Sequence, residues 1–161
     1  MHVAYIGLGS NLDGPERRIE QALTALDDFP LTHLVKASPC YASAPVGPQD
    51  QPDFVNAVAC ISTCLSPLAL LDQLQALEQA HRRRRLRHWG PRTLDLDLLT
   101  FDDLCLDLPR LKVPHPHMRE RAFVLVPLAD IAPDLIVAGT PLPHLLARVT
   151  DGRLRRLSPQ R

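Results

Sequence analysis

The feature that most constrains the fold of this chain is the alternation in 93-TLDLDLL-99. Residues that alternate in this way cannot form one apolar face on a helix, because helical faces repeat every three or four residues. In an extended strand, the same spacing puts the leucines on one side of a sheet and Asp95 and Asp97 on the other. Residues 93–101 are therefore predicted to form a strand with one buried face and one polar face.

Other segments show the same alternation, and helical spacing separates them. The further expected strands are residues 2–10, 31–43 and 53–65. The expected helices start at Pro15 and Pro67; the first stops between Asp27 and Pro30, and the second runs about four turns to the arginines at 82–87. The resulting order, β-α-β-β-α-β, favours a single α+β domain of ferredoxin-like type over residues 1–161, with a mainly antiparallel sheet and helices packed on it.

The last third of the chain is expected to add smaller elements. After the proline-marked 113-VPHPH-117, residues 118–131 predict a helix that is broken at Pro127 or ends near Pro133. The tail from Leu142 predicts a short helix and an edge strand within residues 153–158.

Composition excludes several classes of protein. The 161 residues are 45% hydrophobic and 22% charged, with a formal net charge of zero, so the chain is globular and has no overall attraction to nucleic acid or an anionic membrane. Because no apolar run approaches the roughly 18 residues that span a bilayer, and the N-terminus lacks a basic leader region, a cytoplasmic location is expected. The four cysteines lack metal-site spacing and are expected to be reduced and buried.

Charge is distributed unevenly around the predicted acidic strand. Residues 82–92 carry six arginines and no acid, whereas residues 93–109 carry five aspartates and no lysine or arginine. Arginine matches phosphate oxygens in two-pronged contacts, and Mg²⁺ binds through one or two carboxylates together with substrate phosphates. The β-carbons of Asp95 and Asp97 are expected roughly 6 to 7 Å apart, close enough for both to reach a pair of divalent ions. This pattern predicts a site for metal-bound polyphosphate.

The same residues allow other interpretations. The aspartates could be a solvated strand face, and the arginines a helix end stabilised by the helix dipole. A metal-dependent phosphohydrolase would use Asp95 and Asp97 to activate water. An RNA-binding module of the same fold would use the arginines, although aromatic residues are only 4% of the chain and none is interleaved with the run. A P-loop is excluded, because GxxxxGK[ST] does not occur.

Four blocks, spread over nearly the whole chain, are similar to one known family. They are YIGLGSN, 45-PVGPQDQPDFVNAV-58, 89-WGPRTLDLDLL-99 and 113-VPHPHMRERAFVL-125. Together they resemble the 6-hydroxymethyl-7,8-dihydropterin pyrophosphokinases of folate biosynthesis. The resemblance implies a ferredoxin-like monomer that transfers pyrophosphate from ATP to the hydroxymethyl group of 6-hydroxymethyl-7,8-dihydropterin and releases AMP. It also implies two Mg²⁺ ions as cofactors, and neither nucleic acid nor a membrane as a partner.

The resemblance further implies roles for individual residues. It makes Asp95 and Asp97 the metal ligands, and it adds Arg83, Arg85 and Arg92 as catalytic arginines on the triphosphate. The implied ATP contacts are Gln75, Glu78, Trp89, Arg92, His115 and Arg121. The implied pterin contacts are Ser43, Pro45, Val46, Phe54, Asn56, Asp95 and Phe123, with the two phenylalanines stacking on the ring. Loops 44–52 and 82–92 are expected to close over the substrates.

Three positions depart from the family pattern. Arg82 stands where glycine is usual, which leaves the flexibility of the following loop open. His88 stands where arginine is usual, which leaves one nucleotide contact open. Phe54 stands where tyrosine is frequent, and stacking on the pterin needs only the ring.

Overall fold

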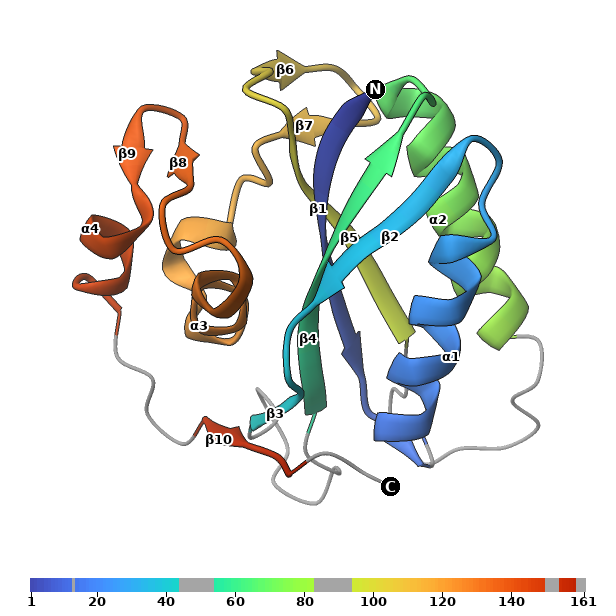
Figure 1. Cartoon of the computed structure of the whole chain (residues 1–161), viewed down its shortest axis with the longest axis horizontal. Coiled ribbons are helices and arrows are strands. Elements are labelled where there is room, and N and C mark those ends of the chain that lie inside the picture. Colours follow the sequence, from blue (N-terminus) through green and yellow to red (C-terminus); the bar gives the residue numbers. More distant parts are fainter. Residues whose placement is uncertain (13, 44–53, 83–93, 150–153, 159–161) are drawn as a thin grey trace.

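The computed structural model describes residues 1–12, 14–43, 54–82, 94–149 and 154–158. These residues form a six-stranded sheet in the order β10-β3-β4-β1-β5, and β2 pairs with β4 beside β3 (Figure 1). The strands are β1 (His2–Ser10), β2 (Thr32–Ala37), β3 (Tyr41–Ser43), β4 (Phe54–Thr63), β5 (Leu94–Phe101) and β10 (Arg155–Arg156). All of their pairings are antiparallel.

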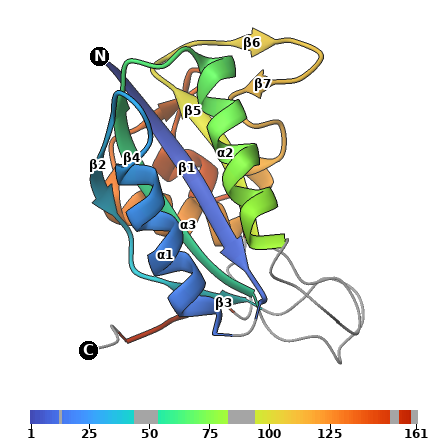
Figure 2. The same cartoon turned by 90° about the vertical axis from the view of Figure 1, so that its right-hand side faces the viewer.

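Two helices cover one face of this sheet. They are α1 (Pro15–Asp27) and α2 (Pro67–Arg82), and they lie side by side in Figure 2. Both are amphipathic, and their apolar residues pack against the leucines and isoleucines of β1, β4 and β5. The fully buried members of this core include Ile6, Ile19, Leu26, Ile61, Leu70, Leu74 and Leu94.

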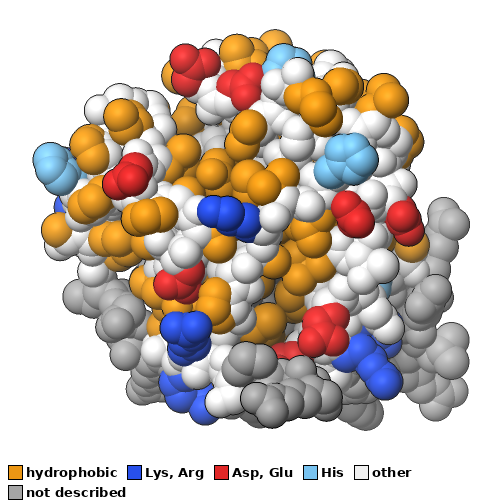
Figure 3. Space-filling view, in the orientation of Figure 1, with side chains coloured by type: hydrophobic (Ala, Val, Ile, Leu, Met, Phe, Trp, Pro, Cys, Tyr) orange, Lys and Arg blue, Asp and Glu red, His pale blue; other side chains and the backbone are white. Residues whose placement is uncertain are grey.

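The opposite face is covered in part by the C-terminal third. A 3-10 turn, η1 (Met118–Glu120), leads into α3 (Ala122–Ile131), which packs on Val58 and Leu99 in a second apolar cluster. Smaller elements complete the described chain: the hairpin β6 (Leu106–Asp107) and β7 (Lys112–Val113), the hairpin β8 (Ile136–Val137) and β9 (Thr140–Pro141), and α4 (Leu142–Leu146). Some large apolar side chains stay exposed, and Figure 3 shows apolar groups scattered among charged ones.

The predicted order of strands and helices is confirmed, and the sheet order is that of a ferredoxin-like α+β fold. The prediction of one strand over 31–43 is wrong, because the segment divides into β2 and β3. Pro39 lacks an N–H for the ladder, and Ser38 bridges the break: its N–H donates to the Val58 carbonyl, and its Oγ accepts from the Val58 N–H.

The single helix predicted over 118–131 is also wrong at its start. Arg121 is extended, with φ −116° and ψ 107°, so a separate 3-10 turn precedes α3. Pro127 lies inside α3 without breaking it, and the helix ends before Pro133 as expected.

The four cysteines are free, as predicted, but Cys64 and Cys105 are exposed and not buried. Within the described part of the chain, no helix is long and apolar enough to cross a membrane.

Candidate active site

Strand β5 alternates as its sequence predicts. Leu96 is 4% exposed and belongs to the core under α1 and α2, whereas Asp95 and Asp97 are half-buried on the other face. On the neighbouring strand, Gly9 lies opposite Asp95 and Gly7 lies opposite Asp97. Because glycine has no side chain, β1 places no side chain beside either carboxylate on this face.

A cross-strand row continues from Asp95 over Gly9 to Asn56 on β4. Asn56 is buried, and its Nδ2 donates to Ser43 Oγ on β3 at 2.8 Å. Its Oδ1 lies so close above Gly9 that a Cβ on Gly9 would be 3.0 Å away. The glycine therefore lets an amide from β4 and a carboxylate from β5 occupy one polar row.

Two half-buried phenylalanines lie on elements of this side of the sheet. Phe54 begins β4 two residues before Asn56, and alternation puts both on the same face. Phe123 is the second residue of α3 and packs against the second apolar cluster. The Arg121 guanidinium lies 5.6 Å from the centre of the Phe123 ring. Flat rings on the side of the sheet that carries the polar row suit a planar ligand.

Glu78, near the C-terminal end of α2, reaches β5. Its Oε2 accepts from the Leu96 N–H at 2.8 Å, between the two aspartates in the sequence. This contact fixes the end of α2 beside the carboxylate pair.

Gln75, one turn earlier, is exposed, and its Oε1 accepts from Arg110 Nη2 at 3.1 Å. The same Nη2 donates to Asp72 at 2.6 Å. Sequence reasoning missed Arg110, because no motif marks it and only the hairpin β6–β7 brings it to α2.

His115 lies beside the end of β5, where it interacts with the charge of Asp97. Its backbone N–H donates to the Leu99 carbonyl at 2.8 Å, and its ring Nδ1 accepts from the backbone N–H of His117 at 3.1 Å. Nδ1 is therefore unprotonated, and the ring proton of neutral His115 is on Nε2. Burial lowers the pKa of His115, the Asp97 carboxylate opposes this, and Arg121 and His117 lower the pKa further. A neutral imidazole can donate its Nε2 proton to a phosphate oxygen.

The donors present fit a hard divalent cation. Asp95 and Asp97 supply carboxylate oxygens, which Mg²⁺ prefers. Among the described residues, no group of three or more His, Cys, Asp or Glu side chains could hold a metal ion. Mg²⁺ that is held by one or two carboxylates commonly takes its other ligands from water or from the phosphates of a ligand.

The described structure brings part of the expected site together. Ser43, Phe54, Asn56, Asp95 and Asp97 lie on one face of the sheet, and Phe123 lies on α3, which packs on that face. The other expected residues that lie outside the described residues are Pro45, Val46, Arg83, Arg85, Trp89 and Arg92. The two loops that are expected to close lie there as well, apart from Arg82 at the end of α2.

Comparisons with known proteins agree on one family. The family described as 7,8-dihydro-6-hydroxymethylpterin-pyrophosphokinase matches residues 5–133. The 2-amino-4-hydroxy-6-hydroxymethyldihydropteridine pyrophosphokinase of Pseudomonas aeruginosa is 56% identical over 154 residues, which cover 95% of this chain and 95% of the relative. The protein of that name from Haemophilus influenzae is 48% identical over 160 residues, covering 99% of this chain and 100% of the relative.

Solved structures share the fold. The HPPK-DHPS protein of Plasmodium falciparum, crystallised with pteroate, superposes with a TM-score of 0.73 at 14% identity. The alignment covers 91% of this chain and 42% of that one, so this chain spans less than half the length of that solved protein. The likeness confirms the ferredoxin-like fold predicted from the sequence.

Proposed function

The chain belongs to the 7,8-dihydro-6-hydroxymethylpterin-pyrophosphokinase family, and from that membership we propose how its residues perform the reaction. It is a pyrophosphokinase of folate biosynthesis, which transfers pyrophosphate from ATP to the hydroxymethyl group of 6-hydroxymethyl-7,8-dihydropterin. A bond forms between the hydroxymethyl oxygen and the β-phosphorus, and the bond from that phosphorus to the α,β-bridging oxygen breaks. The hydroxyl proton is released, and AMP leaves.

One observation carries the assignment of residues: Asp95, Gly9 and Asn56 form a single row across three strands. The carboxylate end of this row suits a metal-bound phosphate, and the amide end suits a pterin edge. Because only a glycine separates them, the attacking hydroxyl and the β-phosphorus can be held next to each other. Such positioning supplies much of the rate in phosphoryl transfer.

The pterin is proposed to lie between Phe54 and Phe123, with Asn56 reading its polar edge. Asn56 is held in place by its bond to Ser43, so its amide is oriented before the ligand arrives. Pro45 and Val46 are proposed to complete this side.

Asp95 and Asp97 would hold Mg²⁺, and we propose two ions. When bound, the ions neutralise phosphate charge and stabilise the leaving oxygen. His115 is neutral and donates from Nε2 to a phosphate oxygen, and Arg121 adds a positive charge beside it. Gln75, Glu78 and Trp89 are proposed to contact the nucleotide, and Arg83, Arg85 and Arg92 to surround the triphosphate.

We further propose that residues 1–161 act as one domain, as a monomer, in the cytoplasm. The family match over residues 5–133 and the two relatives aligned over at least 95% of their lengths support the single domain. Sedimentation of the purified protein at several concentrations tests the monomer, and a mass that rises with concentration would contradict it.

Incubation with ATP, Mg²⁺ and the reduced pterin alcohol tests the activity. AMP and the pterin diphosphate are expected in equal amounts, without ADP. Omitting the pterin is the control, and phosphate released from ATP without it would favour the phosphohydrolase. Titration with labelled RNA at two salt concentrations tests the binding-module alternative, for which a steep loss of affinity with salt would be expected.

A further inference from the structure

A hydrogen bond joins the strand beside Asn56 to the helix that carries Phe123. Tyr41, on β3, is 7% exposed, and its hydroxyl donates to an Asp130 carboxylate oxygen on α3. The two residues are 89 positions apart in the chain. Burial and then the bond to Asp130 together raise the pKa of Tyr41 to about 12, although Arg156 on β10 opposes them, so the hydroxyl stays a donor.

Tyr41 belongs to the same row as the proposed active site. It lies directly opposite Asn56 in the β3–β4 register, as Asn56 lies opposite Gly9. Tyr41 also lies two residues before Ser43, whose Oγ accepts from Asn56. A displacement of Tyr41 would thus move the hydroxyl that orients the Asn56 amide.

Asp130 is at the other end of the same helix as Phe123. The two residues are seven positions apart, which is about two helical turns, so they lie on similar sides of α3. The bond from Tyr41 to Asp130 therefore connects the polar wall, Ser43 and Asn56, to the helix that presents the aromatic wall, Phe123.

Strand β3 is short enough to depend on such a bond. It has three residues, pairs with β4 through three positions and is flanked by the two-residue β10. Backbone pairing sets its register within the sheet. Contact with α3 is needed to set its distance from the covering helix, because sheet hydrogen bonds lie in the plane of the sheet.

We propose that Tyr41 and Asp130 are positioning residues that hold the polar and aromatic walls of the pterin site at the correct separation. The inference deepens the proposed function and rests on it. Neither residue needs to touch a substrate: Tyr41 acts through Ser43 and Asn56, and Asp130 acts through α3 and Phe123.

The test compares Tyr41→Phe with the wild type in steady-state kinetics for both substrates. Loss of the hydroxyl is expected to raise the KM for the pterin about fivefold to tenfold and to leave the KM for ATP within about twofold. Asp130→Ala should raise the KM for the pterin to the same extent, and the double variant should have a pterin KM no higher than that of either single variant. Asp130→Asn keeps an oxygen acceptor and should restore most of the pterin affinity.

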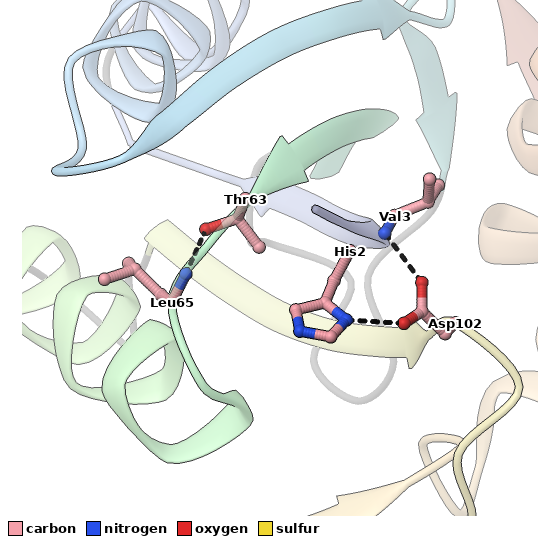
Figure 4. Close-up of polar contacts among 5 residues, drawn as sticks. All are labelled: His2, Val3, Thr63, Leu65 and Asp102. Atoms are coloured by element: carbon pink, nitrogen blue, oxygen red, sulfur yellow. Dashed lines mark hydrogen bonds and ion pairs between the residues drawn. The ribbon is translucent and has the colours of Figure 1, made fainter.

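The matched control weakens a contact at the opposite end of the sheet, between Asp102 and His2 (Figure 4). Asp102→Asn is expected to change the KM of neither substrate. Equal increases of both KM values in Tyr41→Phe, or a lower Tm with both KM values unchanged, would overturn the inference in favour of a purely structural role. Calorimetric measurement of pterin affinity compares Tyr41→Phe with the wild type without turnover. Absence of AMP from the wild-type reaction would instead count against the proposed function.

Discussion

The two faces of the central sheet differ in what their residues do. The helices α1 and α2 cover one face (Figure 2), where the strands present closely packed apolar side chains such as Ile6 and Leu96. On the other face, the same strands carry Gly9, Asn56 and Asp97. Because side chains alternate along a strand, one residue step separates stabilisation of the fold from proposed chemistry.

This difference also predicts opposite responses to substitution. Half-buried Asp95 and Asp97 contribute no apolar burial to the core under α1 and α2, so their substitution is expected to cost little stability. The leucines beside them lose apolar burial when they are shortened. Variants of the polar face should therefore reduce activity and leave the free energy of unfolding nearly unchanged. Variants of the apolar face should lower the free energy of unfolding and leave the activity of the folded molecule nearly unchanged.

Asp97→Asn should have the largest effect on the polar face. Loss of one proposed metal ligand is expected to lower kcat/KM roughly a thousandfold or more, which corresponds to a loss of several kcal/mol of transition-state stabilisation. The free energy of unfolding should change by less than about 1 kcal/mol, because the side chain is only half-buried and contributes nothing to the apolar core. AMP formation and urea unfolding measure the two quantities, and near-full turnover would refute the assigned role.

Leu96→Ala tests the apolar face one residue away. The side chain is 4% exposed, so its truncation should lower the free energy of unfolding by about 2 to 5 kcal/mol. Activity per folded molecule should remain, because the Leu96 N–H can still donate to Glu78. A loss of activity at temperatures where the variant is fully folded would show that the faces are not separable.

Gly9→Ala tests whether the polar row needs the glycine. The new Cβ would lie 3.0 Å from Asn56 Oδ1, so the amide must move and its bond to Ser43 weaken. The expected cost is about 1 kcal/mol of stability and about a tenfold higher KM for the pterin. Gly7→Ala is the control, since the three atoms nearest to its Cβ would be side-chain carbons of Leu99, the first at 3.3 Å. Equal pterin KM values in the two variants would contradict the assignment.

Asp102→Asn should have the smallest effect. Asp102 accepts from the Val3 N–H at 2.8 Å and contacts His2 Nδ1 at 2.7 Å. The bond from Val3 is the main cause that lowers the pKa of Asp102, and His2 adds to it. Its side chain is 35% exposed, so solvent screens the interaction and the loss should be below about 1 kcal/mol.

The pH dependence of that loss has a definite sign. Because the folded pKa of Asp102 is below the unfolded value near 3.9, its contribution is present above about pH 4 and disappears as the pH falls through the folded pKa. Unfolding curves of wild type and variant should differ at neutral pH and converge in acid. A difference that grows on acidification would show that the charge of Asp102 is not its source.

Local pattern was sufficient to predict much of the fold. The alternation around Asp95 and the helical spacing after Pro15 and Pro67 depend on near neighbours in the chain, and the strand and the two helices that they predict are present. The errors occurred where tertiary context interrupts a local pattern. Pro39 has no N–H to donate to β4, so β2 ends before it, and the extended backbone of Arg121 separates a 3-10 turn from α3.

The site was predicted unevenly for the same reason. Asp95 and Asp97 could be identified as a pair from their spacing alone, while the other expected residues came from family resemblance. The bond from Arg110 to Gln75 and the bond from Tyr41 to Asp130 have no sequence signal, because they join segments 35 and 89 residues apart.

By itself, the sequence determined which residues alternate, where helices begin, and that two carboxylates share a strand face, since these follow from backbone geometry over a few residues. Only the tertiary structure decided that Gly9 lies between Asp95 and Asn56, and that α3 reaches Tyr41. Strand register and helix packing are set by the whole core, so the partners of a polar side chain emerge only when distant segments have been brought together.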